Sequence, residues 1–480
     1  MELSREFMLG RIMARDTAFD GVFLTGVHTT GIYCLPSCSA RKPHAENVDF
    51  YHTEADAQAA GFRPCRRCKP DNFYRGLDPD RERLEAALVA LRAQPARFGS
   101  VADLARATAT GVSKLNALVR RHYHTTPAVL LARARVGAAQ RALQEGQRAI
   151  DAALGAGFES LSAFNESFRR WTGLRPRDWA RLGDDDGFTL RLPPGYLEGP
   201  ALRVHGRDDD SPTERVTGRT IVKLLNIDDQ PVRLDIRVAR GLARCTVRAG
   251  AKRPGASVAC AAHAAAIRML GLDQDPAQFE RRIARQRRTR GLVNGRAGTR
   301  VPLTADPFEA LVWCIVGQQV NLAFAYSMRR ALISLAGSPA GGGMRAHPTP
   351  AQVGALDYSD LTAQRYSRRK AEYLIDAARA VHAGSLPLAQ LAERPATVVE
   401  RTLLDVRGLG PWSTNYLMMR GFGFADCVPV GDTGLGTALE RFFALDARPD
   451  AQAVRTLMEP FAPFRSLATF HLWLSLGDAP

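Results

Sequence analysis

The sequence predicts a multidomain α+β fold that is mainly helical, and three observations support this prediction. The chain has 480 residues, too many for one hydrophobic core, so three or four domains are expected. Four cysteines near the amino terminus have the paired spacing of a small metal-bound domain. Helical patterns fill most of the rest, except where Val232, Leu234, Ile236 and Val238 alternate with Arg and Asp, as in a half-buried strand of an antiparallel sheet.

Changes in composition divide the chain into four expected domains. A cysteine-containing domain covers residues 1–76, an Arg-rich helical domain covers 81–182, a small sheet-containing domain covers 187–300, and a mainly helical domain covers 301–480. The polar run 183–187, between the second domain and the third, indicates a linker.

The start of one long helix in the last domain is marked by its residue types. Asp306 suits the cap position and Pro307 suits the first helical position. Glu309 is expected to close a capping box by reaching back to Asp306. The helical region that follows is interrupted by a Gly- and Pro-rich loop over 337–350.

The charge of the chain indicates a polyanionic partner. It carries 65 basic and 49 acidic residues, a net charge of +16, and nucleic acid is the usual partner of such a protein. A basic surface with no such partner is the alternative. No apolar run follows Met1, so neither a signal peptide nor a membrane partner is expected. Four further cysteines without paired spacing indicate a reducing compartment.

The amino-terminal cysteines have the spacing of metal ligands. They form a C-x3-C pair and a C-x2-C pair separated by 26 residues, and the four are Cys34, Cys38, Cys65 and Cys68. One Zn²⁺ bound by four thiolates is the expected outcome, and a disulfide framework is the alternative. Four thiolates on Zn²⁺ leave a net negative charge, so one sulfur can stay nucleophilic at neutral pH.

Basic side chains beside these cysteines suggest a use for such a sulfur. Arg66 and Arg67 could hold a phosphate backbone against the cluster. An electrophilic methyl group on that backbone could then pass to sulfur. Methylation would remove one negative charge and so strengthen the attraction to DNA. A purely structural zinc site is the alternative.

The residues around the cysteines resemble a known family. TTGIYC-x-P-x-C-x-AR-x-P, followed by AGFRPC-x-RC-x-P, is similar to the zinc domain of Ada-type DNA repair proteins, which accept a methyl group from a DNA phosphotriester. The first cysteine of the quartet is the acceptor in that family, so the resemblance implies this role for Cys34. No Pro-Cys-His-Arg motif occurs in the chain. Methyl transfer from O6-methylguanine, the second Ada activity, is therefore not expected.

Two helix-turn-helix units are predicted between residues 101 and 182. Apolar positions at helical spacing, a glycine turn and a second basic helix occur twice there. The stretch GFESLSAFNESFRRWTGLRPRDW resembles the second unit of AraC-type transcription regulators. Candidates for contact with DNA bases are polar residues of the second helices, with a solvated helix face as the alternative. They are Ser113, Lys114, Asn116, Ser162 and Asn165.

The carboxy-terminal half contains a glycine-rich turn followed directly by a helix. Gly408 and Gly410 would let the backbone approach a phosphate. DVRGLGPWSTNYLMMRGFG resembles the helix-hairpin-helix of DNA glycosylases, and residues 187–480 are similar to AlkA-type 3-methyladenine glycosylases. This resemblance implies that Asp432 is the catalytic carboxylate, with a surface or capping role as the alternative.

The same resemblance implies an aromatic pocket for a flipped base. The positions that match it are Trp412, Tyr416 and Trp473. Ordinary core packing is the alternative for Trp473. Trp412 also stands where relatives that nick the strand carry a Schiff-base lysine, so base removal without strand cleavage is expected. An iron–sulfur cluster is not expected, since no four-cysteine signature follows the domain.

One residue differs from the glycosylase family, and one run of arginines has two possible roles. Gln319 stands where the best-known relatives carry an apolar residue that wedges into the duplex. Six arginines between Arg281 and Arg290 indicate either a phosphate-binding face or a solvated helix face.

Together these patterns favour a fusion of an alkylation sensor and transcription activator with a glycosylase for bases such as 3-methyladenine. The expected partners are double-stranded DNA, both alkylated and promoter DNA, and RNA polymerase. The expected location is the bacterial cytoplasm, on the nucleoid when bound to DNA. A transcription regulator whose glycosylase half only binds damaged DNA is the alternative.

Overall fold

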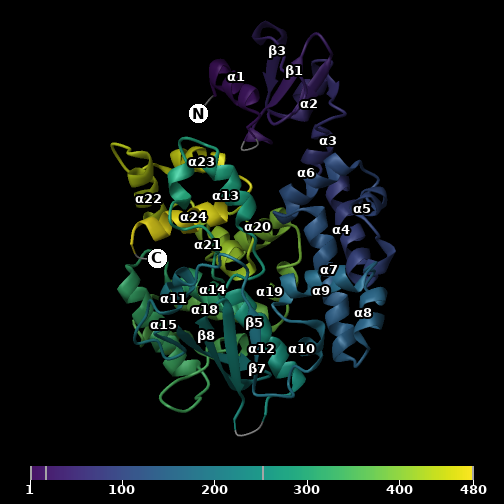
Figure 1. The fold of residues 1–480 in the computed structure, drawn as a ribbon. Coiled ribbons are helices and arrows are strands. Elements are labelled where there is room, and N and C mark those ends of the chain that lie inside the picture. Colours follow the sequence, from purple (N-terminus) through teal and green to yellow (C-terminus); the bar gives the residue numbers. More distant parts are fainter. Residues whose placement is uncertain (1–2, 17–18, 251–252, 478–480) are drawn as a thin grey trace. The chain divides into compact units, whose positions relative to one another are not determined.

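The computed structural model describes residues 3–16, 19–250 and 253–477. The chain divides into two compact units, Met1–Arg83 and Leu84–Pro480. Figure 1 shows the first unit as a small sheet with short helices and the second as a larger, mainly helical body with one sheet. The prediction of a mainly helical, multidomain α+β chain is confirmed.

The first unit is built on a four-stranded sheet in the order β3-β1-β2-β4. Its strands are β1 Leu24–Val27, β2 Ile32–Cys34, β3 Val48–Tyr51 and β4 Arg63–Pro64, and its helices are α1 Arg5–Ala14, η2 Ala45–Asn47, α2 Glu54–Ala59 and α3 Pro70–Tyr74. β2 pairs antiparallel with β1 and parallel with β4. Cys34 is the last residue of β2 and Cys65 follows β4 directly, so the pairing of these strands brings the two cysteines close together.

The second unit begins within α4 Pro79–Ala93 and contains two helix-turn-helix units near its start. The elements after α4 are η3 Pro95–Arg97, α5 Val101–Ala107, α6 Val112–Tyr123, α7 Pro127–Gln144, α8 Ala149–Gly155, α9 Leu161–Thr172 and α10 Pro176–Ala180. The pairs α5/α6 and α8/α9 confirm the predicted layout. In each pair the second helix buries apolar residues and ends in a left-handed residue, His124 or Gly173.

A five-stranded antiparallel sheet follows, in the order β5-β9-β8-β7-β6. Its strands are β5 Gly187–Arg191, β6 Glu214–Thr217, β7 Thr220–Ile227, β8 Gln230–Ala239 and β9 Leu242–Arg248, with helices α11 Gly199–His205 and α12 Ala256–Met269. The strand predicted from the alternation at 232–238 is confirmed as β8. Its four apolar side chains are buried and its arginines are not.

The second helix-turn-helix unit and the five-stranded sheet share one hydrophobic core. Phe168 and Trp179 belong to the same buried cluster as Leu190 of β5 and Ile236 of β8. On α12, His263 makes a hydrogen bond of 2.7 Å to the carbonyl oxygen of Thr172. The run 183–187, expected as a linker, therefore does not separate two cores.

The remaining elements form the carboxy-terminal helical region. They are α13 Ala277–Ala284, η4 Arg290–Val293, α14 Pro307–Val316, α15 Leu322–Ala336, α16 Pro350–Gly354, α17 Tyr358–Thr362, α18 Arg368–His382, α19 Leu388–Leu391, α20 Ala396–Leu404, α21 Pro411–Tyr416, the π-helical turn η5 Leu417–Phe422, α22 Thr433–Phe443, α23 Ala451–Met458, η6 Glu459–Phe461 and α24 Arg465–Ser475. Among the residues described, no helix is long and apolar enough to cross a membrane.

The predicted start of α14 is confirmed, with one correction. The Asp306 side chain accepts a hydrogen bond from the Phe308 N–H at 2.7 Å, and Pro307 is the first helical residue. The expectation that Glu309 closes a capping box is wrong. Its buried carboxylate instead accepts a hydrogen bond from Nζ of Lys223 on β7 at 2.7 Å, which satisfies two charges that would otherwise be buried alone.

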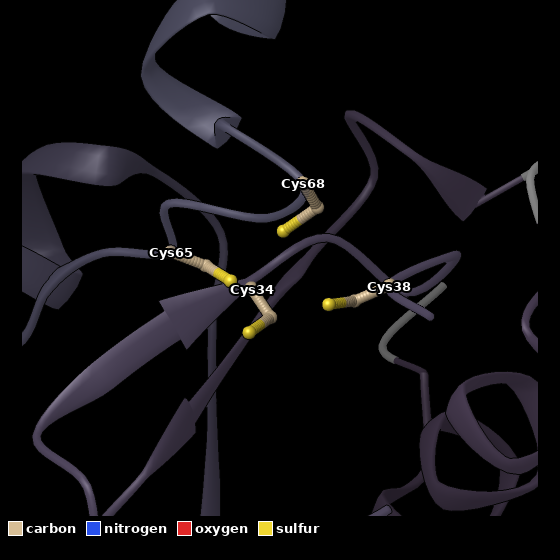
Figure 2. A group of neighbouring side chains, drawn as sticks. All are labelled: Cys34, Cys38, Cys65 and Cys68. Carbon is tan, nitrogen blue, oxygen red and sulfur yellow. The ribbon is translucent and has the colours of Figure 1, made fainter. Parts of the chain in front are cut away.

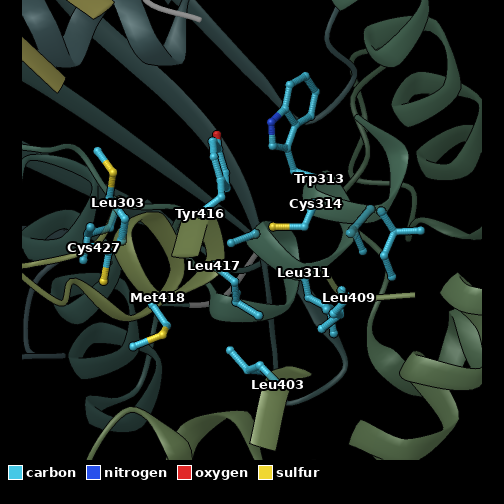
Figure 3. Packing of buried hydrophobic residues seen from close by; sticks show 14 of the residues in the cluster. Leu303, Leu311, Trp313, Cys314, Leu403, Leu409, Tyr416, Leu417, Met418 and Cys427 are labelled. Carbon is cyan, nitrogen blue, oxygen red and sulfur yellow. The ribbon is translucent and has the colours of Figure 1, made fainter. Parts of the chain in front are cut away.

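α14 passes through the middle of the largest hydrophobic core. Figure 3 shows Leu311 and Cys314 of α14 packed near Leu409 and Leu417, which come from either end of α21. Trp313 points away from Leu403, to the same side as Tyr416. These buried side chains therefore hold α21 against α14, and the side chains of Trp313 and Tyr416 extend to the side away from Leu403.

Candidate functional sites

The four predicted metal ligands lie together in the first unit. The sulfur atoms of Cys34, Cys38, Cys65 and Cys68 are all within 4.8 Å of one another, and Figure 2 shows their side chains converging from β2, the loop after it, and the turn before α3. Sulfurs on one tetrahedral zinc ion stand about 3.8 Å apart, given Zn–S bonds of about 2.3 Å. The donor set and its spacing therefore fit one Zn²⁺.

The electrostatics of the cluster also call for a cation. Cys34 and Cys38 form a hydrogen bond between their sulfurs. This bond raises the pKa of Cys34 and lowers the pKa of Cys38 to about 2. Two backbone groups stabilise negative charge on the other sulfurs, the Leu35 N–H on Cys68 and the Arg67 N–H on Cys65, each at 3.4 Å. Thiolates this close together repel one another, and a cation among them offsets that repulsion.

Exposure distinguishes the four cysteines. Cys38 and Cys65 are buried, whereas Cys34 and Cys68 are partly exposed. The side chains of Arg66 and Arg67 lie on the surface. Cys34 and Cys68 therefore both combine membership of the cluster with partial access from solvent.

The candidate base-reading residues occupy matching positions on α6 and α9. Asn116 and Asn165 are each the fifth residue of their helix, and each donates a hydrogen bond to the carbonyl oxygen four residues earlier. Lys114 and Ser162 are exposed, as is Ser113. The structure thus places the five candidates within the first five residues of α6 and α9, and none of them is among the buried residues of these helices.

The glycine-rich turn joins α20 to α21. Gly408 has φ +95°, and a Cβ atom there would come within 2.4 Å of the Tyr373 ring. Its carbonyl oxygen accepts a hydrogen bond of 2.7 Å from Nε2 of Gln318, which also donates to the Ser413 hydroxyl at 3.0 Å. Gly410 is exposed and precedes α21. The turn is therefore fixed from the α14–α15 loop as well as from its own helices.

Seven of the predicted residues line one cleft of about 1140 Å³ in the carboxy-terminal region. They are Gln319, Gly408, Gly410, Trp412, Tyr416, Asp432 and Trp473. Ring centroids are 5.5 Å apart for Trp412 and Tyr416 and 6.1 Å apart for Tyr416 and Trp473. The sequence placed these residues up to 154 positions apart (473 minus 319), and the fold gathers them.

Asp432 is held in this cleft by three N–H donors. Its Oδ1 atom accepts from the Leu435 N–H at 2.7 Å and from Nε1 of Trp473 at 3.0 Å, and its Oδ2 atom accepts from Nε1 of Trp412 at 3.0 Å. Asp432 is thus the cap of α22 and a cleft carboxylate at once. A carboxylate has about four lone-pair sites, so one is left to face the cleft.

Trp473 likewise satisfies both interpretations of the sequence. It is fully buried in the core, and its indole N–H still points to Asp432.

Gln319, the candidate wedge, is exposed in the loop between α14 and α15 with φ +53°. The six arginines from Arg281 to Arg290 are all exposed on and after α13, and this fits either interpretation of that run.

Sequence reasoning missed a group of cations beneath the aromatic cleft. The Arg207 guanidinium lies 4.7 Å from the centroid of the Trp313 ring, and the buried Arg420 guanidinium lies 6.0 Å from that of Tyr416. Burial lowers the pKa of Arg420. Arg207 follows α11, far from the helix-hairpin-helix in sequence, so no local motif marks it.

Three family models match separate parts of the chain. The metal binding domain of Ada matches residues 8–71, a helix-turn-helix domain matches 104–182, and the HhH-GPD superfamily base excision DNA repair protein matches 312–463.

A relative from Mycobacterium tuberculosis (strain CDC 1551 / Oshkosh) extends the likeness to nearly the whole chain. This protein, the probable bifunctional transcriptional activator/DNA repair enzyme AlkA, is 30% identical over 97% of this chain and 95% of its own length. The chain belongs to this family of bifunctional transcriptional activator/DNA repair enzymes. Its resemblance to Ada-type and AlkA-type proteins is thereby confirmed.

One further relative and one solved structure match parts of the chain. The bifunctional transcriptional activator/DNA repair enzyme Ada of Escherichia coli (strain K12) is 31% identical over 36% of this chain and 48% of its own length. The structure of 3-methyladenine DNA-glycosylase from Archaeoglobus fulgidus matches with a TM-score of 0.53 at 20% identity, over 60% of this chain and 97% of that one. The carboxy-terminal half of this family member thus has the fold of 3-methyladenine DNA glycosylases. Its amino-terminal domain is an Ada-type zinc-binding domain.

Proposed function

We propose that this protein removes alkylated bases such as 3-methyladenine from double-stranded DNA by N-glycosidic hydrolysis, and also senses methylated DNA phosphates through Cys34. One observation carries the first activity: the indole N–H groups of Trp412 and Trp473 both bind the Asp432 carboxylate within an aromatic cleft. The protein acts in the bacterial cytoplasm, where it meets alkylated and promoter DNA.

The cleft residues divide the work of base excision. A flipped alkylated purine carries positive charge and stacks on the rings of Trp412 and Tyr416. As the bond from C1′ to the base nitrogen breaks, its electron pair neutralises the base. Asp432 stabilises the positive charge that develops on the sugar. A water oxygen then bonds to C1′, and the Asp432 carboxylate accepts its proton. The three N–H donors fix the carboxylate before the reaction begins.

The backbone turn at Gly408 and Gly410 is proposed to hold the DNA phosphates, and Gln319 is proposed to fill the space left by the flipped base. Gln319 is exposed at the rim of the same cleft. Gln319 also has a positive φ, a strained conformation for a non-glycine residue that often occurs at functional sites. The arrangement supports a wedge, although its side chain is polar.

Methyl transfer is proposed at Cys34. The Cys34 sulfur attacks the methyl carbon of a phosphotriester, the S–C bond forms, and the C–O bond breaks with its electron pair returning to phosphate. Zn²⁺ held by the four cysteines would keep the sulfurs as thiolates at neutral pH. Arg66 and Arg67 hold the DNA backbone. The cluster loses one negative charge, so its attraction to DNA increases.

The increased attraction to DNA is proposed to switch on transcription. The zinc domain then brings the helix-turn-helix pair to promoter DNA, where α6 and α9 read bases through Lys114, Asn116, Ser162 and Asn165. RNA polymerase is the expected recipient of this activation.

The reaction products test the proposed chemistry of the cleft. Full-length protein incubated with methylated duplex is expected to release free 3-methyladenine and to leave abasic sites in unbroken strands, because Trp412 offers no amine for a Schiff base. Strand breaks should appear only after alkali. Gel electrophoresis with and without alkali, together with chromatography of freed bases, measures both. A borohydride-trapped protein–DNA adduct would contradict hydrolysis by water, and intact duplex with no freed base would contradict the function.

A further inference from the structure

Polar groups on α4, α6 and α7, within and beside the first helix-turn-helix unit, contact the part of the chain that follows residue 187. His122 on α6 hydrogen-bonds the hydroxyl of Thr397 on α20 at 3.0 Å. Arg92 on α4 donates to the Glu393 carbonyl oxygen at 2.8 Å, and Arg133 on α7 donates to the carbonyl oxygen of Asp273 at 2.8 Å. A cleft of about 940 Å³ lies along this seam. The seam is therefore held by discrete contacts around that space.

One of these contacts reaches the loop that presents Asp432. His124 ends α6 with φ +52°, and its ring stands 5.5 Å from that of Phe424 at an interplanar angle of 76°. Its Nδ1 atom accepts a hydrogen bond of 3.2 Å from the Asp426 N–H. Asp426 lies six positions before Asp432, and the segment between them contains no helix or strand.

The same loop is fixed from two helices that carry cleft residues. The Asp426 carboxylate accepts two hydrogen bonds of 2.7 Å from Arg465 at the start of α24, the helix of Trp473. The Val428 N–H donates to Oδ1 of Asn415 at 3.1 Å, on α21 beside Trp412. His124 supplies a third anchor, and it comes from the DNA-binding part of the chain.

We infer that His124 is a positioning residue for base excision, through which the helix-turn-helix part holds the Asp432 loop in its productive place. This inference rests on the proposed role of Asp432. Loss of the acceptor would leave the Asp426 N–H without its partner and loosen the start of the loop. The Asp432 carboxylate would then be less well placed for its hydrogen bonds from the indole N–H groups of Trp412 and Trp473. A small displacement of a catalytic group is costly to rate.

Burial favours the neutral form of the His124 ring, and only an unprotonated Nδ1 can accept this hydrogen bond. Burial lowers its pKa to about 4; Asp426 opposes this shift, while Arg465 and His122 add to it. A protonated ring would lose the Nδ1 lone pair and face the Arg465 guanidinium. The hydrogen bond is therefore present at neutral pH and is lost only as the pH falls through this low pKa.

Two substitutions separate the hydrogen bond from the packing of the ring. His124→Asn keeps an acceptor at the position of Nδ1, and Asn tolerates a positive φ. His124→Phe keeps a ring against Phe424 but has no acceptor. Arg133→Ala is the matched control, because it removes another contact of the seam that does not touch the Asp432 loop.

The test is single-turnover excision of 3-methyladenine by the full-length variants. His124→Phe is expected to slow the excision rate about tenfold, with unchanged affinity for a duplex carrying a tetrahydrofuran abasic analogue. His124→Asn and Arg133→Ala should stay within about twofold of the original protein. If His124 had only a structural role, His124→Phe would lower thermal stability and would not slow excision while leaving the affinity for DNA unchanged.

Three outcomes would overturn the inference. They are a normal rate for His124→Phe, equal losses for the Phe and Asn variants, and a loss for Arg133→Ala as large as that for His124→Phe. Asp432→Asn, assayed alongside, tells this failure from failure of the proposed function. If Asp432→Asn is inactive and His124→Phe is normal, only the positioning role is wrong.

Discussion

Asp432→Asn is expected to lower the release of 3-methyladenine from methylated duplex by about a hundredfold to a thousandfold. The amide has nearly the same shape and its oxygen can still cap α22. It cannot offset the positive charge that develops on the sugar. Its NH₂ group would also face an indole N–H of Trp412 or Trp473, where the carboxylate now accepts two hydrogen bonds. Single-turnover kinetics with chromatography of the freed base measures the effect.

Measurements of DNA binding show whether a variant has lost base release alone or has also lost recognition of damaged DNA. Asp432→Asn should bind a duplex carrying a tetrahydrofuran abasic analogue about as tightly as the original protein, with an unchanged zinc content. Asp450→Asn is a matched control, since Asp450 caps α23 by the same kind of hydrogen bond, to the Ala453 N–H. It should excise normally. Base release at the original rate by Asp432→Asn would show that Asp432 is not the catalytic carboxylate. No release by the original protein, with normal binding, would favour the alternative, in which the glycosylase half only binds damaged DNA.

Cys34→Ser is expected to abolish methyl uptake from methylated DNA, from one methyl group per chain to none. The hydroxyl is a far weaker nucleophile than a zinc-held thiolate, although it can still lie near the metal. Base excision should be unaffected, because Asp432 and its donors belong to the other compact unit. Transfer of radioactive methyl from labelled DNA to protein measures the loss.

A remote cysteine provides the control for methyl uptake. Cys260 on α12 is partly exposed but lies outside the four-sulfur cluster. Cys260→Ser should therefore accept methyl groups like the original chain. Undiminished methyl uptake by Cys34→Ser would show that another sulfur is the acceptor, with the partly exposed Cys68 as the next candidate.

Local pattern and family resemblance together predicted much of the fold and most of the residues that gather in the cysteine cluster and in the cleft. The strand at 232–238 follows from alternation alone, because its side chains meet only two environments. The cysteine cluster follows from spacing, because zinc requires four donors at one point. Asp432 and its aromatic neighbours were reached through resemblance, and their shared cleft is what the fold adds.

Contacts between distant segments could not be predicted in this way. Glu309 has the right position for a capping box, yet Lys223, 86 residues away, takes its carboxylate. The polar run 183–187 has the composition of a linker, yet the elements on either side bury one core. No local motif marks His124, and the residue whose N–H it binds lies 302 positions later. In each case burial of a distant partner outweighs the local preference.

Mass spectrometry of the full-length protein after exposure to methylated duplex tests the central claim most directly, because one sample reports both activities. The account predicts one added methyl group, located on the peptide that contains Cys34, and free 3-methyladenine in the same solution. A folded, zinc-loaded chain that gains no methyl group on any cysteine and releases no base would contradict it.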